Sequence, residues 1–180
     1  MTYCFAFGGY KTSGKTTLAE LLRTELQPRT TLHQNFADSV YAELASVLNI
    51  SLDEIYKNKS VFRPALQWLG TEYWRNYRNE PEHWITDWQA RFTVSESVLN
   101  LTAVVVSDVR FPNELAALRR QFAGGFRSVW VDRPGLTPDF TSGHISEISL
   151  IPADFDVRIS NGGTKTDLAR VAENLAGLLD

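Results

Sequence analysis

The segment at residues 9–16 has the residue types and the spacing that suit phosphate binding. It reads GYKTSGKT and matches the pattern G-x-x-x-x-G-K-S/T in full. A loop of this kind points backbone N–H groups and the positive end of a helix dipole at a phosphate chain. Lys15 would then bind the phosphates of a nucleotide, and the Thr16 hydroxyl would bind Mg²⁺. The pattern therefore predicts a bound nucleoside triphosphate, but it leaves the reaction open.

Two observations narrow the class of nucleotide-binding protein. A guanine-reading N-K-x-D motif is absent, because Asn58 and Lys59 are followed by Ser60 and Val61. A chain of 180 residues also leaves little room for motor or oligomeric ATPase machinery. A small kinase is the favoured class. The alternative for the loop itself is a glycine-rich turn without a ligand.

A second centre follows the apolar run VVV at residues 104–106. In an open parallel sheet, ligands bind outside the carboxyl ends of the strands, so Asp108 is predicted to hold Mg²⁺ directly or through water. Arg110 could face the same cleft. A turn residue and a surface arginine are the respective alternatives. Asp38, after the second expected strand, is either a helix N-cap or a carboxylate on the acceptor side.

Residues 62–78 carry two stripes at helical spacing, one apolar and one polar. The polar stripe suits the wall of an anion pocket, because guanidinium groups bind phosphate bidentately; a solvated helix face is the alternative. Tryptophans in and near this segment could stack on a base, although such residues more often belong to a core. The apolar stripe is Phe62, Leu66, Leu69, Tyr73 and Tyr77; the polar stripe is Arg63, Gln67, Thr71 and Arg75; the tryptophans are Trp68, Trp74, Trp84 and Trp88.

The elements that must position these residues alternate along the chain. Strands are expected at residues 3–7, 31–36, 101–107, 126–131 and 155–159, and amphipathic helices separate most of them. Residues 51–100 look helical, with breaks near Pro64 and Pro81, and a capping box is expected at residues 164–167. This order predicts an α/β fold with a doubly wound, mainly parallel five-stranded sheet. We expect a single domain with a helical acceptor-binding region at about 37–100 and a lid-like loop at about 133–153.

The composition excludes several classes of protein. Apolar residues make up 43% and charged residues 22%, which excludes a fully disordered chain, and a net charge of −3 argues against non-specific nucleic-acid binding. The single Cys4 excludes an internal disulfide framework, and His33, His83 and His144 do not combine with it at zinc-ligand spacing. No apolar stretch approaches the roughly 18 residues that span a bilayer. With no signal-peptide pattern evident, we expect a cytoplasmic protein.

Several segments together resemble the deoxynucleoside monophosphate kinases of large DNA phages, within the wider group of P-loop nucleotide and dephospho-coenzyme A kinases. Besides the phosphate loop, they are FAD at 36–38, LQWLGTE at 66–72 with Arg75, SDVRFPNE at 107–114, HISE at 144–147 and ISNGGT at 159–164. They cover most of the chain in the family's order. The segments at 66–72 and 107–114 are much more specific than the phosphate loop. The chain departs from the pattern at Ser39 and Val40, where proline and leucine are expected, so the base of the acceptor is left open.

The resemblance implies ATP-dependent, Mg²⁺-assisted phosphorylation of a deoxynucleoside 5′-monophosphate to the diphosphate. The expected partner is a small-molecule nucleotide acceptor, with no membrane and no stable nucleic-acid partner; a homodimer is left open. If the chain is phage-encoded, it would act in the host cytoplasm. The rival readings are a P-loop kinase of a hydroxymethylated pyrimidine in DNA, against which the acidic net charge argues, and a P-loop protein without transfer activity.

The resemblance also assigns residues to the site, although it leaves the lid arginine open among Arg119, Arg120 and Arg133. The catalytic set is Lys15, Asp38, Asp108 and Arg110, and the Mg²⁺ ligands are Thr16 and Asp108. The ATP site is Gly9, Lys11, Thr12, Ser13, Gly14, Lys15, Thr16, Thr17, Asn161 and Gly162. The acceptor site is Asp38, Arg63, Gln67, Trp68, Thr71, Arg75, Arg110, His144 and Glu147.

Overall fold

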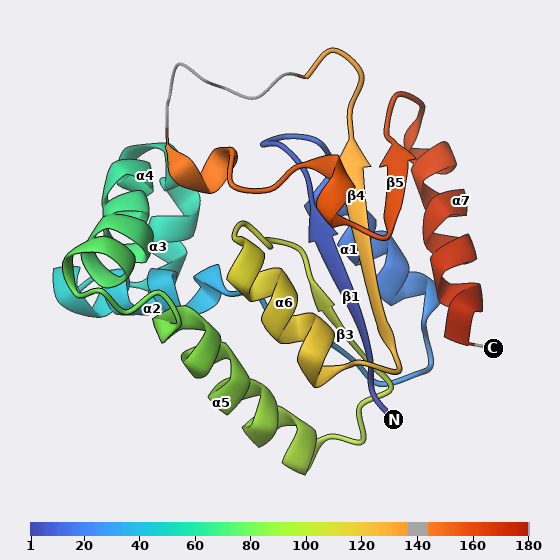
Figure 1. The fold of residues 1–180 in the computed structure, drawn as a ribbon, viewed down its shortest axis with the longest axis horizontal. Helices are drawn as coiled ribbons and strands as arrows, with labels where there is room; N and C mark the ends of the chain where they lie inside the picture. Colours follow the sequence, from blue (N-terminus) through green and yellow to red (C-terminus); the bar gives the residue numbers. More distant parts are fainter. Residues whose placement is uncertain (137–143, 180) are drawn as a thin grey trace. The chain divides into compact units, whose positions relative to one another are not determined.

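A five-stranded parallel sheet frames the site in this computed structural model, which describes residues 1–136 and 144–179. Neighbouring strands are parallel throughout, and the order β2-β3-β1-β4-β5 places β1 in the middle, between β3 and β4 (Figure 1). The predicted α/β class with a five-stranded sheet is thus confirmed. The strands are β1 (Tyr3–Gly8), β2 (Thr31–His33), β3 (Ala103–Val106), β4 (Phe126–Asp132) and β5 (Val157–Ser160).

The chain divides into two compact units. Unit 1 contains Met1–Asn35 and Ser95–Asp180 and includes the whole sheet, whereas unit 2 contains Phe36–Val94 and is helical. Unit 2 covers nearly the same residues as the helical region expected at about 37–100. The assignment of that region to the acceptor, and of the chain to a single kinase domain, stays a prediction.

The central strands of unit 1 are buried on both faces. Residues 4–7 of β1 and all four residues of β3 have no exposed surface, so their continuous apolar runs meet side chains above and below the sheet. Burial raises the pKa of the Cys4 thiol far above its usual value. Cys4 is therefore a packing residue of the sheet and not a nucleophile.

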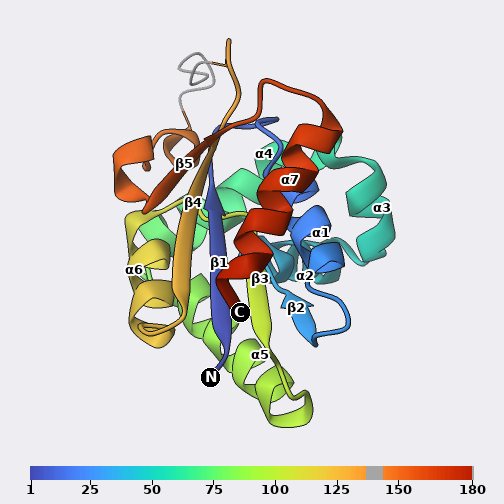
Figure 2. The same ribbon diagram turned by 90° about the vertical axis from the view of Figure 1, so that its right-hand side faces the viewer.

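Helices cover both faces of this sheet. The helices α1 (Lys15–Glu25) and α7 (Lys165–Ala176) pack against each other on one face, and α6 (Pro112–Gln121) lies on the other (Figures 1 and 2). Leu18 and Leu22 of α1 meet Leu168 and Leu175 of α7 in a core that continues into the sheet. The sheet is therefore doubly wound, and its middle strand β1 leads directly into α1.

Unit 2 has a separate apolar core. Its helices are α2 (Ala37–Leu48), α3 (Leu52–Lys57), α4 (Lys59–Gln67), the π-helix η1 (Trp68–Tyr77) and α5 (His83–Val98), the last of which continues into unit 1. The core contains Val40, Leu44, Ile55, Leu69 and Trp84. The expected break near Pro64 is wrong, because α4 runs through this residue, while the break near Pro81 is confirmed between η1 and α5.

The π-helix changes which side chains face the core. Hydrogen bonds from residue i to i+5 widen the turn, so residues four apart no longer stack on one face. Tyr77 was expected in the apolar stripe, but it is 81% exposed, whereas Thr71 of the polar stripe is buried. On α4, burial does not separate the two predicted stripes, because Phe62 and Leu66 are half-buried like Arg63 and Gln67. Along η1, the predicted order is reversed at Thr71 and Tyr77.

Part of the expected lid-like loop at 133–153 lies outside the described residues, because it includes 137–143. The described part contains the short 3₁₀ turns η2 (Ile145–Glu147) and η3 (Pro152–Asp154), and a third such turn, η4 (Gly177–Leu179), follows α7. Among the described helices, none combines the length and the apolar character that crossing a bilayer requires.

Candidate active site

The phosphate loop joins β1 to α1 through an unusual backbone path. Gly9 and Gly14 have φ values of 140° and 104°, and Thr12 has a φ of 64°, which is strained for a β-branched residue. A Cβ atom on Gly14 would lie 2.3 Å from Asn161 Nδ2. Asn161 Nδ2 donates a 2.8 Å hydrogen bond to Ser13 O and so holds the loop from the segment after β5. The predicted loop residues therefore form a tight cradle, and Asn161 is part of it.

Lys15 is nearly buried at the start of α1. Its Nζ donates hydrogen bonds of 2.7 Å to the carbonyl oxygens of Gly9 and Tyr10, and the residue is 8% exposed. The pKa of Lys15 is lowered to about 7, mainly by burial and also by repulsion from Arg110, while Glu147 and Asp108 oppose the shift. These four charged side chains thus interact electrostatically within unit 1.

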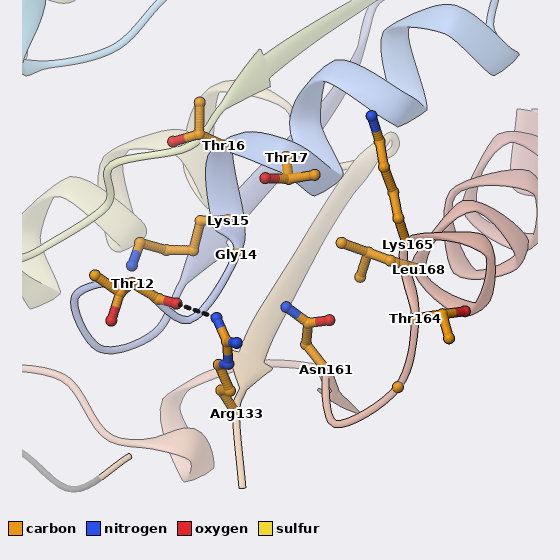
Figure 3. Close-up of a pocket in the computed structure, with 11 residues that line it drawn as sticks. Thr12, Gly14, Lys15, Thr16, Thr17, Arg133, Asn161, Thr164, Lys165 and Leu168 are labelled. Atoms are coloured by element: carbon orange, nitrogen blue, oxygen red, sulfur yellow. Dashed lines mark hydrogen bonds between the residues drawn. The ribbon is translucent and has the colours of Figure 1, made fainter. Parts of the chain in front are cut away.

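A cavity of about 440 Å³ lies against the phosphate loop. Figure 3 shows Lys15, Thr16 and Thr17 from the start of α1, with Arg133, Asn161 and Lys165 from later elements around the same space. Among the described residues that line it, none carries a carboxylate, so its cations and hydroxyl groups suit an anionic ligand. Its lining residues are Thr12, Gly14, Lys15, Thr16, Thr17, Arg133, Asn161, Gly163, Thr164, Lys165 and Leu168.

Other predicted members of the ATP site have different positions. Lys11 is exposed, and neither Lys11 nor Gly162 is among the described residues that line this cavity. Ser13 is 1% exposed, and its Oγ has no hydrogen-bond partner among the described residues. A buried polar atom without a partner inside the loop fits a site that binds a polar ligand.

Two cations of the cavity were not assigned to the ATP site from the sequence. Arg133 directly follows β4, and its Nη1 donates a 3.4 Å hydrogen bond to Thr12 O. Arg119, an alternative for the lid arginine, instead pairs with Asp156 at 2.9 Å. Lys165 opens α7, next to the cap residue Thr164. The sequence contained a signal for both cations of the cavity. Arg133 follows a parallel strand, and Lys165 begins a helix within the predicted capping box, which is confirmed.

The turn after β3 is held by buried polar groups. Asn35 Oδ1 accepts a 2.8 Å hydrogen bond from the backbone N–H of Ser107, and a 2.9 Å hydrogen bond joins Ser107 Oγ to His33 Nε2. Glu114, which is 3% exposed, accepts hydrogen bonds from the backbone N–H groups of Arg110 and Phe111 at 2.8 and 3.1 Å. The ends of β2 and α6 thereby fix the backbone on either side of Asp108.

Sequence reasoning missed the positioning role of Glu114. The signal was available, because Glu114 is the third residue of a helix that begins at a proline, and an acidic residue there accepts N–H groups of the preceding turn. Because a buried carboxylate holds these backbone amides, the backbone at Arg110 is fixed. The Arg110 side chain is then the part of this turn that can change its conformation.

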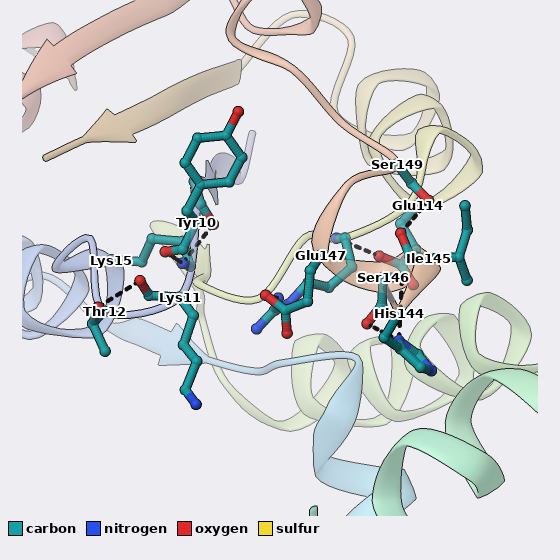
Figure 4. A network of polar contacts seen from close by, with 12 residues as sticks. Tyr10, Lys11, Thr12, Lys15, Glu114, His144, Ile145, Ser146, Glu147 and Ser149 are labelled. Carbon is teal, nitrogen blue, oxygen red and sulfur yellow. Dashed lines mark hydrogen bonds and ion pairs between the residues drawn. The ribbon is translucent and has the colours of Figure 1, made fainter. Parts of the chain in front are cut away.

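Glu147 connects the turn η2 to Arg110. Its Oε2 lies 2.9 Å from Arg110 Nη1. The turn has its own hydrogen bonds, because Ser146 N donates to His144 Nδ1 at 3.3 Å and Ser149 Oγ donates to Ile145 O at 2.7 Å. Figure 4 shows Glu147 extending from this turn toward the phosphate loop. The structure thus brings the HISE segment to Arg110 and to the electrostatic surroundings of Lys15.

The remaining predicted acceptor residues belong to unit 2. Asp38 lies in the first turn of α2, where Phe36 is the N-cap, so the N-cap alternative for Asp38 is wrong. Asp38 Oδ2 lies 3.9 Å from Arg91 Nη1. Arg63 and Gln67 are half-buried on α4, and Trp68 on η1 is 54% exposed. Arg75 donates a 2.9 Å hydrogen bond to Pro81 O. Their part in acceptor binding stays a prediction.

Comparison with known proteins supports the fold. No known protein-family model matches the sequence, and no curated protein matches it either. The APS kinase of Mycobacterium tuberculosis, solved in complex with AMPPNP and APS, is similar over 98% of both chains, with a TM-score of 0.53 and 15% sequence identity. The protein TT1252 from Thermus thermophilus is similar over 99% of this chain and 98% of its own, with a TM-score of 0.56 and 18% identity. This chain therefore shares the fold of this APS kinase and of TT1252.

Proposed function

We propose that this protein is a kinase that transfers the terminal phosphate of ATP to a deoxynucleoside 5′-monophosphate. The observation that carries the proposal is the combination of a complete phosphate loop with a second charged centre, Asp108 and Arg110, which interacts electrostatically with Lys15. A nucleotide-binding protein without transfer activity needs the loop but has no need of a second anion site. Binding of an acceptor phosphate would account for the cation at Arg110.

The donor half of the proposal rests on the cavity beside the loop. Lys15, Arg133 and Lys165 supply three cations around it, and Thr16 and Thr17 supply hydroxyl groups. The APS kinase of the same fold was solved with AMPPNP, which supports a nucleoside triphosphate as the donor here. In this proposal, Lys15 exchanges the carbonyl oxygens of Gly9 and Tyr10 for phosphate oxygens and stabilises the charge that develops on them.

The residues present also fit Mg²⁺. Among residues 1–136 and 144–179 there is no group of three or more His, Cys, Asp or Glu side chains that could form an all-protein metal cage. Mg²⁺ is commonly held by one or two carboxylates together with phosphates and water, which matches Asp108 with the Thr16 hydroxyl. The ion would neutralise charge on the phosphates of the donor.

The acceptor half is the more specific claim and rests on the resemblance together with Arg110. A guanidinium group binds a phosphate dianion bidentately, and Arg110 lies in the charged cluster around Lys15. We assign Asp38, Arg63, Gln67 and Arg75 of unit 2 to the remainder of the acceptor. The segment LQWLGTE, which contains Gln67, is the sequence feature that favours a deoxynucleotide over other small acceptors.

The test is a coupled ADP-release assay with ATP, Mg²⁺ and a panel of common and modified deoxynucleoside monophosphates. We expect ADP release that depends on at least one monophosphate, with the diphosphate as product. ADP release only with DNA that contains a hydroxymethylated pyrimidine would favour the rival kinase. Nucleotide binding without acceptor-dependent ADP release would contradict a kinase altogether.

A further inference from the structure

The Arg110–Glu147 ion pair is unequal in its burial. The Glu147 side chain is 7% exposed, whereas that of Arg110 is 29% exposed, and the two charged atoms are 2.9 Å apart. A carboxylate is costly to bury without a cationic partner, so Glu147 is held in place by the pair. The guanidinium of Arg110, in contrast, remains partly accessible. It has five N–H donors, and the contact with Glu147 uses only some of them.

We propose that Glu147 is a positioning residue, which orients the guanidinium of Arg110 toward the acceptor phosphate and does not contact the acceptor itself. This inference rests on the proposed function, because it assumes that Arg110 binds a phosphate. It replaces the direct acceptor contact that was predicted for Glu147 from the sequence. The enclosed carboxylate and the accessible guanidinium favour this division of roles.

The negative charge of Glu147 is a second argument for its positioning role. Arg110 and Lys15 are both cations that would bind phosphates of the same reaction, and two positive charges in one site repel each other. Glu147 and Asp108 act on Lys15 in the opposite direction. Arg133 and Lys165 add further positive charge around the adjoining cavity. Glu147 therefore offsets repulsion that would otherwise turn the flexible Arg110 side chain away from Lys15.

Both ends of the pair start from a backbone that other residues hold. Glu114 binds the backbone N–H of Arg110, and the η2 turn is closed by the hydrogen bonds of His144 and Ser149. The long arginine side chain still has several rotatable bonds, and ordering them costs conformational entropy. A partner that orders this side chain before the acceptor arrives removes part of that cost from binding.

The first experiment compares Glu147→Gln and Glu147→Asp with the parental protein. We expect Glu147→Gln to raise the acceptor KM about tenfold, the lower end of the effect of a lost charge-assisted bond. The ATP KM should change less than the acceptor KM, and Glu147→Asp, which keeps the charge, should recover part of the acceptor affinity. Asp154→Asn is the matched control: Asp154 is an exposed carboxylate three residues after Ile151, whose N–H its Oδ2 accepts, and asparagine keeps an acceptor oxygen.

The second experiment combines Glu147→Gln with Arg110→Met, which removes the cation that Glu147 binds. If Glu147 acts only through Arg110, the double variant should be no worse than Arg110→Met alone, because Glu147 then has no guanidinium to orient. Effects that multiply would overturn the proposal and assign Glu147 its own contact with the acceptor. Parental acceptor kinetics in Glu147→Gln would also overturn it, and the ion pair would then be structural.

A binding measurement separates this inference from the proposed function. If the parental protein phosphorylates no monophosphate, the proposed function fails, and the pair is then tested by calorimetry with inorganic phosphate alone. We expect weaker phosphate binding in Glu147→Gln than in the parental protein and in Asp154→Asn, with matching melting curves for folded protein. Where Glu147→Gln does not fold, Glu147→Asp is measured in its place. Equal phosphate affinities in the parental protein and the folded variant would contradict the positioning role of Glu147.

Discussion

The ammonium group of Lys15 binds two carbonyl oxygens of its own loop, a bonding that a phosphate can replace. We expect Lys15→Met to reduce phosphoryl transfer about a hundred- to a thousandfold, the usual effect of removing one donor aimed at developing charge. The melting temperature should change little, because the variant loses two hydrogen bonds but no longer buries an ammonium group. Steady-state turnover and a melting curve on the same preparation check this. Turnover close to the parental value would remove Lys15 from the chemistry.

Lys15 also predicts proton uptake when a nucleotide binds. Its pKa of about 7 lies below the usual value of 10.5, so near pH 8 much of the side chain is neutral before a nucleotide is added. Phosphates beside Nζ favour the charged form, so binding raises this pKa and takes up a fraction of a proton. Calorimetry of ADP binding at pH 8 should give heats that depend on the ionisation enthalpy of the buffer. Lys15→Met should lose that dependence, and equal heats in all buffers for the parental protein would refute the lowered pKa.

Whether a site residue can be predicted from the sequence depends on how far along the chain it lies from the residues that it contacts. Lys15 and Thr16 follow from a continuous pattern of eight residues, because the loop that presents them is local. The partner of Arg110 could not be derived from spacing, since Glu147 is brought to it by the path of the chain after β4. Arg133 shows the same limit, because its contact with Thr12 joins residues far apart in sequence.

Among the elements, a polar contact fastens the segment before β5 to β4. Asp156 Oδ2 accepts hydrogen bonds from Ser128 Oγ and Ser128 N at 2.7 and 3.1 Å, and Arg119 of α6 binds Oδ1 at 2.9 Å. Burial by itself would raise the pKa of Asp156, but the hydrogen bonds from Ser128 and the charge of Arg119 outweigh it, so the pKa is lowered. The contact therefore depends on a charged carboxylate.

The pH dependence of stability tests this contact. A carboxyl group whose pKa is lower in the folded state adds stability above its unfolded value, here 3.8, and loses that stability as the pH falls through the folded value. We expect Asp156→Ala to lower the free energy of unfolding by about 1–2 kcal/mol near neutral pH, from hydrogen bonds lost. The difference from the parental protein should shrink below pH 3.8. Glu173→Ala, an exposed change on α7, is the control, and a difference that persists unchanged into acid would contradict the role of the charge.

Elements were predictable where a single local rule decides them. Apolar runs predict β1 and β3, because strands buried on both faces exclude polar residues, and the capping box predicts the start of α7. The π-helix η1 was not predictable, since bulky residues such as Trp68, Tyr73 and Trp74 fit either type of helix. The packing of unit 2 decides between them, and this packing involves α2 and α4, which contact η1.

The whole molecule combines two units of different predictability. The alternation of strands and helices predicts the sheet of unit 1 and the carboxyl edge at which the phosphate loop and Asp108 both lie. Unit 2 interrupts that alternation between β2 and β3, and its role is inferred from residue types and from the resemblance. An experiment on the whole chain can test the role of unit 2, because an acceptor should affect unit 2 and a donor should affect unit 1 only.

Hydrogen exchange read by mass spectrometry supplies that experiment. ADP should slow amide exchange at residues 9–17 and 161–168 of unit 1, and the best acceptor monophosphate should slow it at residues 59–78 of unit 2. At a hundred times Kd the slowing can reach about a hundredfold, since ligand binding then stabilises the bound form by about 2.7 kcal/mol. Arg75→Lys should reduce the acceptor's effect on unit 2 and leave that of ADP intact, because lysine keeps the charge but cannot bind phosphate bidentately.

The matched control for this experiment is Arg78→Lys. Arg78 is exposed three residues after Arg75 and lies 3.3 Å from Glu80, so it has the same chemistry without a predicted acceptor contact. Exchange in the control should match the parental protein with either ligand. If the acceptor slowed exchange only in unit 1, the acceptor site would be built around Arg110 and Lys15 alone. Arg63, Gln67 and Arg75 would then have no part in acceptor binding.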